Sequence, residues 1–152
     1  MRRPYMILLI VVGVVVFLAI SGLLARAFSV AGAEQAAITA LVRAEAHGDQ
    51  NGVISLIANC APDAACRARA AADSVALRHP GAVSIAEINP SSSFSLGSTL
   101  GTARVAWLAG GSLPRVQCLR VRHAGDILSG FRVQLLEVSL RIRSNADCPK
   151  RF

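Results

Sequence analysis

Three side chains of the sequence are of types that could transfer a proton: Asp73, His123 and Glu137. A carboxylate or an imidazole acts as a general acid or base when its pKa lies near the working pH. No two of the three stand at a spacing that requires a shared site, and Asp73 and Glu137 are more simply interpreted as solvated or ion-paired. We therefore assign no catalytic residue, and an enzyme is not the favoured interpretation.

Sequence motifs for nucleophilic and nucleotide chemistry are absent. The run Ser91-Ser92-Ser93 follows Pro90 and is typical of a loop, because the G-x-S-x-G of a nucleophile elbow does not occur. Neither a P-loop nor a dinucleotide-binding fingerprint is present. We expect no cofactor.

The sequence holds four cysteines, all of which follow the apolar N-terminal segment: Cys60, Cys66, Cys118 and Cys148. They lack the C-x-x-C spacing of zinc sites, and the histidines stand at no recognisable ligand spacing, so no metal site is expected. Two disulfides formed in an oxidising compartment account for an even number of thiols.

Four cysteines allow three pairings. Local geometry favours Cys60 with Cys66, because the first is expected to end one helix and the second to lie in the opening turn of the next. Pro62 turns the chain between them. The remaining pair, Cys118 with Cys148, would tie the C-terminal tail to a strand.

Basic residues concentrate in the last third of the chain, where nine Lys and Arg residues from Arg104 onward stand against three acids. Alternation along the expected strand puts Arg120 and Arg122 on one face, and Arg132 is expected on a neighbouring strand. Two interpretations remain open: ordinary solvated charges, or a surface that attracts an acidic envelope protein or anionic lipid headgroups. Nucleic acid is not an expected partner, because the aromatic residues that would stack on bases are few.

The N-terminal segment is the strongest structural signal. Residues 5–25 are almost continuously apolar and carry no charge, and a helix that crosses a membrane needs about 20 such residues. Arg2 and Arg3 precede this segment, so the tail 1–4 is expected in the cytoplasm and the remainder of the chain outside it. The sequence therefore predicts a single-pass protein of the cell membrane, with the lipid bilayer as its first partner.

A cleaved signal peptide is the alternative to this anchor. Small residues at 25–27 and 31–33 could serve as cleavage sites, which would make the protein secreted. The apolar run exceeds the usual 7 to 15 or so residues of a signal's core, so we favour the uncleaved anchor. Both alternatives place residues 27–152 outside the cytoplasm, where cysteines oxidise.

Three helices are expected beyond the anchor, over residues 34–47, 49–60 and 62–79. Residues 26–33 are expected to be a linker. Gly48 can end the first helix, and Asp49 is typical of an N-cap for the second. Pro62 fits the opening turn of the third helix, where Asp63 would complement the positive N-terminal dipole.

Strand-like runs follow, at residues 83–88, 94–96, 102–108, 116–123 and 127–142. Short connections at 109–111 and 124–126 predict an antiparallel meander of four to five strands, so the class is α+β with the helices on one face of the sheet. The apolar parity switches at Leu135 and Leu136, which predicts a bulge or a strong bend there. Trp107 is interpreted as core or pocket lining. The domain should end near residue 143, before a tail 144–152 held by a disulfide.

The expected order of elements is three helices, with Gly48-Asp49 at the start of the second, and then a curved antiparallel sheet with a long bent last strand. This order resembles the nuclear-transport-factor-like superfamily, whose fold is cone-shaped and cystatin-like. The likeness is to its small bacterial membrane-anchored or secreted members, over roughly residues 33–143. It implies a sheet wrapped around a pocket closed by helices, used for ligand binding, isomerase or dehydratase chemistry, or protein association. Isomerases of this fold commonly use a Tyr donor, whereas the only tyrosine here is Tyr5, in the anchor.

The predicted function is a membrane-tethered extracytoplasmic binding or protein-interaction module. The alternative is a small-molecule-binding protein or an isomerase or dehydratase that uses the pocket of a cone fold, because a fold by itself does not choose among activities. A deep cavity with an Asp or His at its floor would favour the alternative, and an interior filled by apolar side chains would favour the module.

Overall fold

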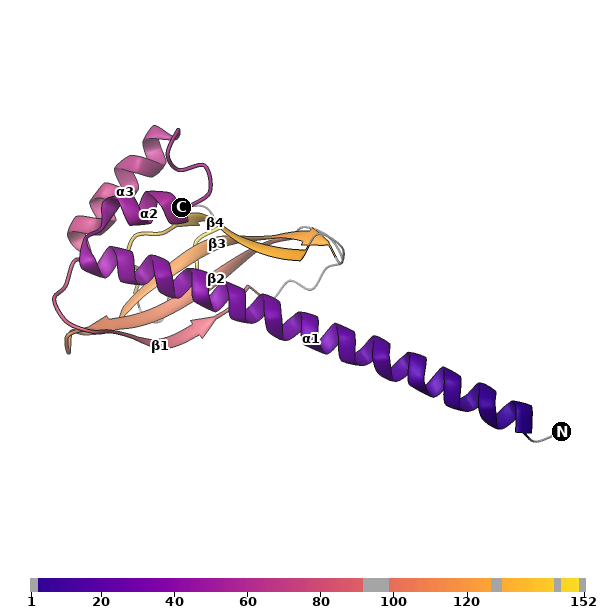
Figure 1. The fold of residues 1–152 in the computed structure, drawn as a ribbon. Coiled ribbons are helices and arrows are strands. Elements are labelled where there is room, and N and C mark those ends of the chain that lie inside the picture. The colour runs from indigo at the N-terminus through magenta and orange to yellow at the C-terminus, as the bar shows by residue number, and fades with distance from the viewer. Residues whose placement is uncertain (1–2, 92–98, 127–129, 144–145, 151–152) are drawn as a thin grey trace.

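The computed structural model describes residues 3–91, 99–126, 130–143 and 146–150 (Figure 1). The fold is α+β, as predicted: three helices come first and a four-stranded antiparallel sheet follows. The expected short strand at 94–96 lies outside the described residues.

Helix α1 (Arg3–His47) is a single helix of 45 residues that includes both the apolar segment and the first helix of the domain. Residues 26–33, expected to be a linker, are helical. They contain no proline, and Gly32 alone costs only about 1 kcal/mol relative to alanine in a helix interior. Figure 1 shows the apolar half of α1 projecting away from the sheet and the second half lying across it.

The C-terminus of α1 is closed by Gly48, as expected. Its φ of 72° is in the left-handed region that glycine adopts without strain. The Gly48 amide donates to the Glu45 carbonyl at 3.0 Å and the Asp49 amide to the Ala44 carbonyl at 2.9 Å. This paired arrangement satisfies two carbonyls that a helix end leaves without partners.

Helix α2 (Gln50–Leu56) begins after Asp49, whose carboxylate accepts the Gly52 amide at 2.9 Å, as an N-cap does. The helix ends before Cys60, earlier than predicted. Ile57 is extended and forms a bridge with Leu135, and the Ala58 amide donates to the Leu135 carbonyl at 2.7 Å. The sheet therefore takes over the backbone hydrogen bonds that would have lengthened α2.

Helix α3 (Ala64–Ala76) has Asp63 as its N-cap, with the carboxylate accepting the Ala65 amide at 2.8 Å and the Cys66 amide at 3.3 Å. Pro62 consequently precedes the helix and does not occupy its opening turn as predicted. An aspartate that caps the helix satisfies free amides directly, in addition to the dipole interaction expected for it.

The sheet is a meander in the order β1-β2-β3-β4, with every pair antiparallel. Its strands have these bounds: β1 Val83–Asn89, β2 Thr99–Ala109, β3 Arg115–Asp126 and β4 Gly130–Val138. Gly110 and Gly111, both with positive φ, lie in the β2–β3 connection, where the turn was predicted. Strand β4 stops at Val138, short of the predicted Ile142, although Ile142 still forms a bridge with Val116.

The predicted bulge is present in β4. Val121 pairs with Leu135 but Arg120 pairs with Glu137, so Leu136 is the extra residue. An extra residue restores to one face two side chains that strict alternation would place on opposite faces. Leu135 and Val138 are accordingly both buried.

The core lies between the helices and one face of the sheet. Its largest fully buried apolar side chains come from α1, α2 and the three later strands: Ile38, Leu41, Val42, Val53, Val105, Trp107, Leu119, Val121 and Leu135. Trp107 is thus a core residue, with none of its surface exposed. Strand β3 runs antiparallel to the second half of α1, because Gln117 lies near Glu45 whereas His123 contacts Glu34.

The opposite face of the sheet is partly covered by the C-terminal tail. A disulfide joins Cys118 on β3 to Cys148, and the second disulfide joins Cys60 to Cys66 between α2 and α3. The Cα–Cα separations are 5.7 Å and 5.2 Å, respectively. These are the two pairs that the sequence favours.

The two disulfides should differ in their contribution to stability, because they close loops of 30 and 6 residues. Loop-closure entropy gives about 4 kcal/mol for the longer loop and about 2 kcal/mol for the shorter one. Cys148→Ala should therefore lower the free energy of unfolding more than Cys66→Ala, as measured by urea titration of the full chain in detergent. Equal losses, or a larger loss for Cys66→Ala, would show that loop length does not govern these bridges.

Candidate functional site

Two carboxyl groups meet in the interior between the helices. Glu45 stands in the last turn of α1 and Asp73 in the second half of α3, and both residues have none of their surface exposed. Glu45 follows Ile38, Leu41 and Val42 at helical spacing on one face of α1, and the structure buries all four side chains. The prediction that Asp73 is solvated or ion-paired is wrong, because helix packing brings it to the like-charged Glu45.

None of the four oxygens of Glu45 and Asp73 has a hydrogen-bond partner among the described residues. The polar neighbour on the sheet is Gln117, whose own groups are engaged elsewhere. Its carbonyl oxygen accepts the Trp107 indole N–H at 2.7 Å, and its amide donates to the Ser139 carbonyl at 3.3 Å. Burying a charge without a partner is expensive, so the protonation of the two acids decides the energy of this region.

Burial raises the pKa of Glu45 from its ordinary 4.5 to about 8, and the neighbouring Asp73 raises it further, whereas the Gln117 amide opposes the shift. Burial also raises the pKa of Asp73, from 3.8 to about 6, and the Arg69 guanidinium opposes that shift. At neutral pH Glu45 is therefore mainly a neutral carboxylic acid that can donate a proton. Burial is the main cause of this protonation, and the charge of Asp73 adds to it.

A second buried polar cluster links α1 to the end of β3. The Glu34 carboxylate lies 2.8 Å from His123 Nε2 and accepts the Ser91 backbone amide, also at 2.8 Å. His123, one of the predicted acid–base candidates, is therefore held by an acid. The predicted loop residue Ser91 is buried and bonded to the same carboxylate. Sequence distance hides this cluster, since 89 residues separate Glu34 from His123.

The predicted basic surface lies on the face of the sheet that points away from the helices. Arg120 and Arg122 share that face, as alternation predicted, and Arg132 on β4 joins them because its partner is Ala124. Arg120 lies 3.6 Å from Glu137 and donates to the Lys150 carbonyl at 2.7 Å. The structure therefore confirms the ion-paired interpretation of Glu137. Arg122 and Arg132 are exposed.

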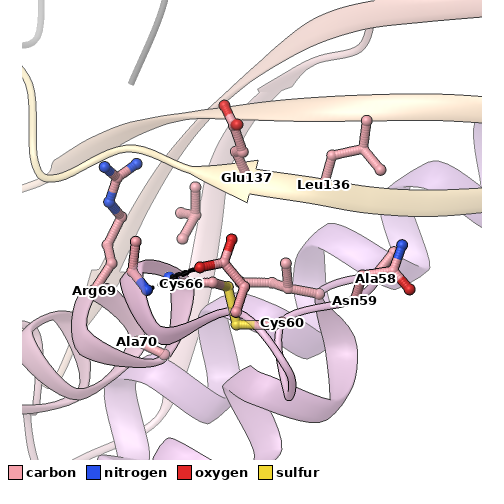
Figure 2. A pocket seen from close by; sticks show the side chains of 12 residues that line it. Ala58, Asn59, Cys60, Cys66, Arg69, Ala70, Leu136 and Glu137 are labelled. Atoms are coloured by element: carbon pink, nitrogen blue, oxygen red, sulfur yellow. Dashed lines mark hydrogen bonds between the residues drawn. A yellow bond between two sulfur atoms is a disulfide. The ribbon is translucent and has the colours of Figure 1, made fainter.

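A small hollow of about 170 Å³ lies between α3 and β4, beside the Cys60–Cys66 disulfide. Figure 2 shows Leu136 and Glu137 on the strand side and Arg69 and Ala70 on the helix side. Neither Glu45 nor Asp73 lines this hollow, and Trp107 does not line it either. Its charged groups are already used in part, because Asp63 caps α3 and Glu137 pairs with Arg120.

The chemical capacity of the interior is limited by access. The Glu45–Asp73 pair could donate and accept a proton, but the hollow between α3 and β4 does not reach it. Within the described part of the chain, no three His, Cys, Asp or Glu side chains gather as ligands for a metal ion.

Comparisons of the chain with protein-family models, with curated proteins and with solved structures find no match. The resemblance to the nuclear-transport-factor-like superfamily therefore stays a prediction.

The raised pKa values of Glu45 and Asp73 predict that the domain loses stability as the pH rises. Below about pH 3 both acids are mainly neutral in the folded and the unfolded chain. Between pH 4 and 8 the folded chain holds more protons than the unfolded one, because the folded pKa values, about 6 and about 8, exceed the ordinary 3.8 and 4.5. The free energy of unfolding should fall across this range, by roughly 3 to 5 kcal/mol for Glu45.

Urea titrations of the full chain in a non-ionic detergent, followed by the fluorescence of Trp107, can measure this slope because Trp107 is the sole tryptophan. Glu45→Gln removes the titrating group and should flatten the dependence between pH 5 and 8. Glu87→Gln, which removes an exposed carboxylate, should keep it. The same slope in Glu45→Gln and in the unchanged protein would contradict the assignment.

Proposed function

We propose that this chain is a membrane-tethered extracytoplasmic module for binding or protein interaction. The N-terminal segment crosses the membrane with the tail 1–4 in the cytoplasm, and the α+β domain stands outside. No catalytic residue is assigned.

The continuity of α1 carries this proposal. The first part of the helix has a mean hydropathy of 3.1 over its most apolar window, and none of that window is buried against the domain. Large apolar side chains from Tyr5 to Leu24 are between 50% and 69% exposed, so they have no protein partner within the chain. About 20 residues of helix cross the hydrocarbon of a bilayer, so an apolar segment of this length can span it.

The disulfides support the location of the domain. Two bridges join all four cysteines, and none is free. Such bridges persist in oxidising compartments and are rare where thiols are kept reduced. Arg2 and Arg3 on the other side of the apolar segment favour the same orientation.

The filled interior supports interaction over catalysis. The face of the sheet beneath the helices is occupied by Trp107, Leu119, Val121 and other buried apolar side chains. One observation favours the enzymatic alternative: Glu45 and Asp73 lie between the helices and the sheet with raised pKa values, a common property of catalytic acids. The hollow between α3 and β4 includes neither acid, so this alternative ranks second.

The proposal predicts the topology of the chain. An enzyme reporter that is active only outside the cytoplasm should be active when fused after residue 152, because a single span carries the C-terminus across. The membrane-bound fraction should resist alkaline carbonate extraction. The reporter fused to a variant with Arg2→Glu and Arg3→Glu should lose activity, since the positive flank sets the orientation.

Two outcomes would contradict the proposal in different ways. An inactive reporter on the unchanged chain would reverse the orientation. Extraction of a shortened chain into the soluble fraction would replace the anchor by a cleaved signal peptide.

A further inference from the structure

Helix α1 forms the anchor and also holds one end of the sheet at a defined distance from the apolar segment. Glu34 is nine residues beyond Ala25, which corresponds to about 14 Å along a helix. Its carboxylate holds both His123 and Ser91 at 2.8 Å. Buried polar contacts therefore hold this end of the sheet against α1.

Strands β3 and β4 extend beyond these contacts toward the anchor. Strand β3 runs antiparallel to α1 and continues past His123 to Asp126, while β4 starts at Gly130 opposite Asp126. Figure 1 shows the β3–β4 end pointing along α1 toward the N-terminus. Each strand residue advances about 3.3 Å, so the level of Ala124 and Arg132 lies about 10 Å from that of Ala25.

This distance of about 10 Å is close to the thickness of the lipid headgroup layer. Lipid headgroups add about 5 to 8 Å to each side of the hydrocarbon. If the hydrocarbon ends near Ala25 and α1 follows the membrane normal, the backbone of Arg132 stands about 3 Å above the headgroups. That gap is shorter than the Debye length of about 8 Å at physiological salt. Arg122 lies two strand residues further from the anchor, so its backbone stands about 10 Å above the headgroups and its long side chain has to extend toward them to come within that length.

The described charge at this end of the sheet is positive. Arg122 and Arg132 are both exposed on the outer face, two strand positions or fewer from Ala124. Asp126 is the one acid of the sequence in the last five residues of β3, and its backbone lies two strand residues nearer the anchor than Ala124; the two arginines exceed it by one charge. Leu100, the neighbour of Arg122 on β2, is 61% exposed and adds an apolar side chain to the same face.

We propose that Arg122 and Arg132 dock this end of the sheet on anionic lipid headgroups of the leaflet in which the chain is anchored. The inference rests on the proposed function, because it needs the membrane anchor. Lipid is favoured over a protein partner because α1 holds the two arginines beside the membrane surface whether or not another protein is near. Each basic residue near an anionic surface favours the docked state, and two together should favour it about 30-fold.

Hydrogen–deuterium exchange of the full chain in nanodiscs can test the proposal. One set of discs contains only zwitterionic phosphatidylcholine, and the other includes anionic phosphatidylglycerol. Docking should slow exchange several-fold in peptides from the start of β4 and the end of β3 when anionic lipid is present. Salt at about 1 M, where the Debye length is about 3 Å, should remove the difference.

A pair of charge-matched variants separates position from total charge. Arg122→Gln with Arg132→Gln should abolish the difference between the two lipids. Arg141→Gln with Arg143→Gln removes the same charge at exposed positions that flank Ile142, opposite Val116 at the other end of β3, and should retain it. Unchanged exchange in peptides from α2 and α3 would show that both variants fold.

Several results would overturn the proposal. Equal exchange at the β3–β4 end in the two kinds of disc would show that this surface does not bind anionic headgroups. It would then face a protein partner or solvent. An equal loss of the lipid effect in both double variants would show that the effect depends on net charge and not on the positions of Arg122 and Arg132. A chain that fails to remain in the discs would instead overturn the proposed function, because the anchor itself would be absent.

Discussion

The structure depends on the continuity of α1 from an apolar surface to a packed core. One half of the helix has exposed apolar side chains all round, and the other half buries a face of Ile38, Leu41, Val42 and Glu45 against the domain. A helix without a break transmits position along its axis, so whatever fixes the anchor also fixes the sheet that packs on it. An anchor formed by this helix would hold the domain at a set height and orientation, in contrast to a flexible tether.

The interior combines this apolar packing with acids that lack partners. Glu45 and Asp73 come from two helices and meet where no hydrogen-bond donor among the described side chains satisfies them. Such groups lower the stability of the folded chain unless they are protonated. The Glu34 carboxylate shows the opposite arrangement, because the Ser91 amide and the His123 ring satisfy it in the same core. The contrast identifies Glu45 and Asp73 as the pair whose protonation affects the stability of the domain.

The outer face of the sheet divides into a covered and an open region. The C-terminal tail, tied to Cys118 through Cys148, covers the middle of β3, and Arg120 is engaged there with Glu137 and the Lys150 carbonyl. Arg122 and Arg132 lie beyond this cover, at the end nearer the anchor. The three arginines that alternation groups on one face therefore have different surroundings, and only the last two combine full exposure with proximity to the anchor.

The sequence by itself determined the local features: the apolar helix, the Asp49 N-cap, the Gly48 terminus, the α+β order and the bulge at Leu136. Each of these depends on neighbouring residues, through periodicity, capping or a parity switch. The shorter α2, the meeting of Glu45 with Asp73 and the contact of His123 with Glu34 were decided only by tertiary structure. Those features need segments up to 89 residues apart to come together. The packing of α1 on α3 and on β3 sets which buried acids face one another, and no local pattern specifies that choice.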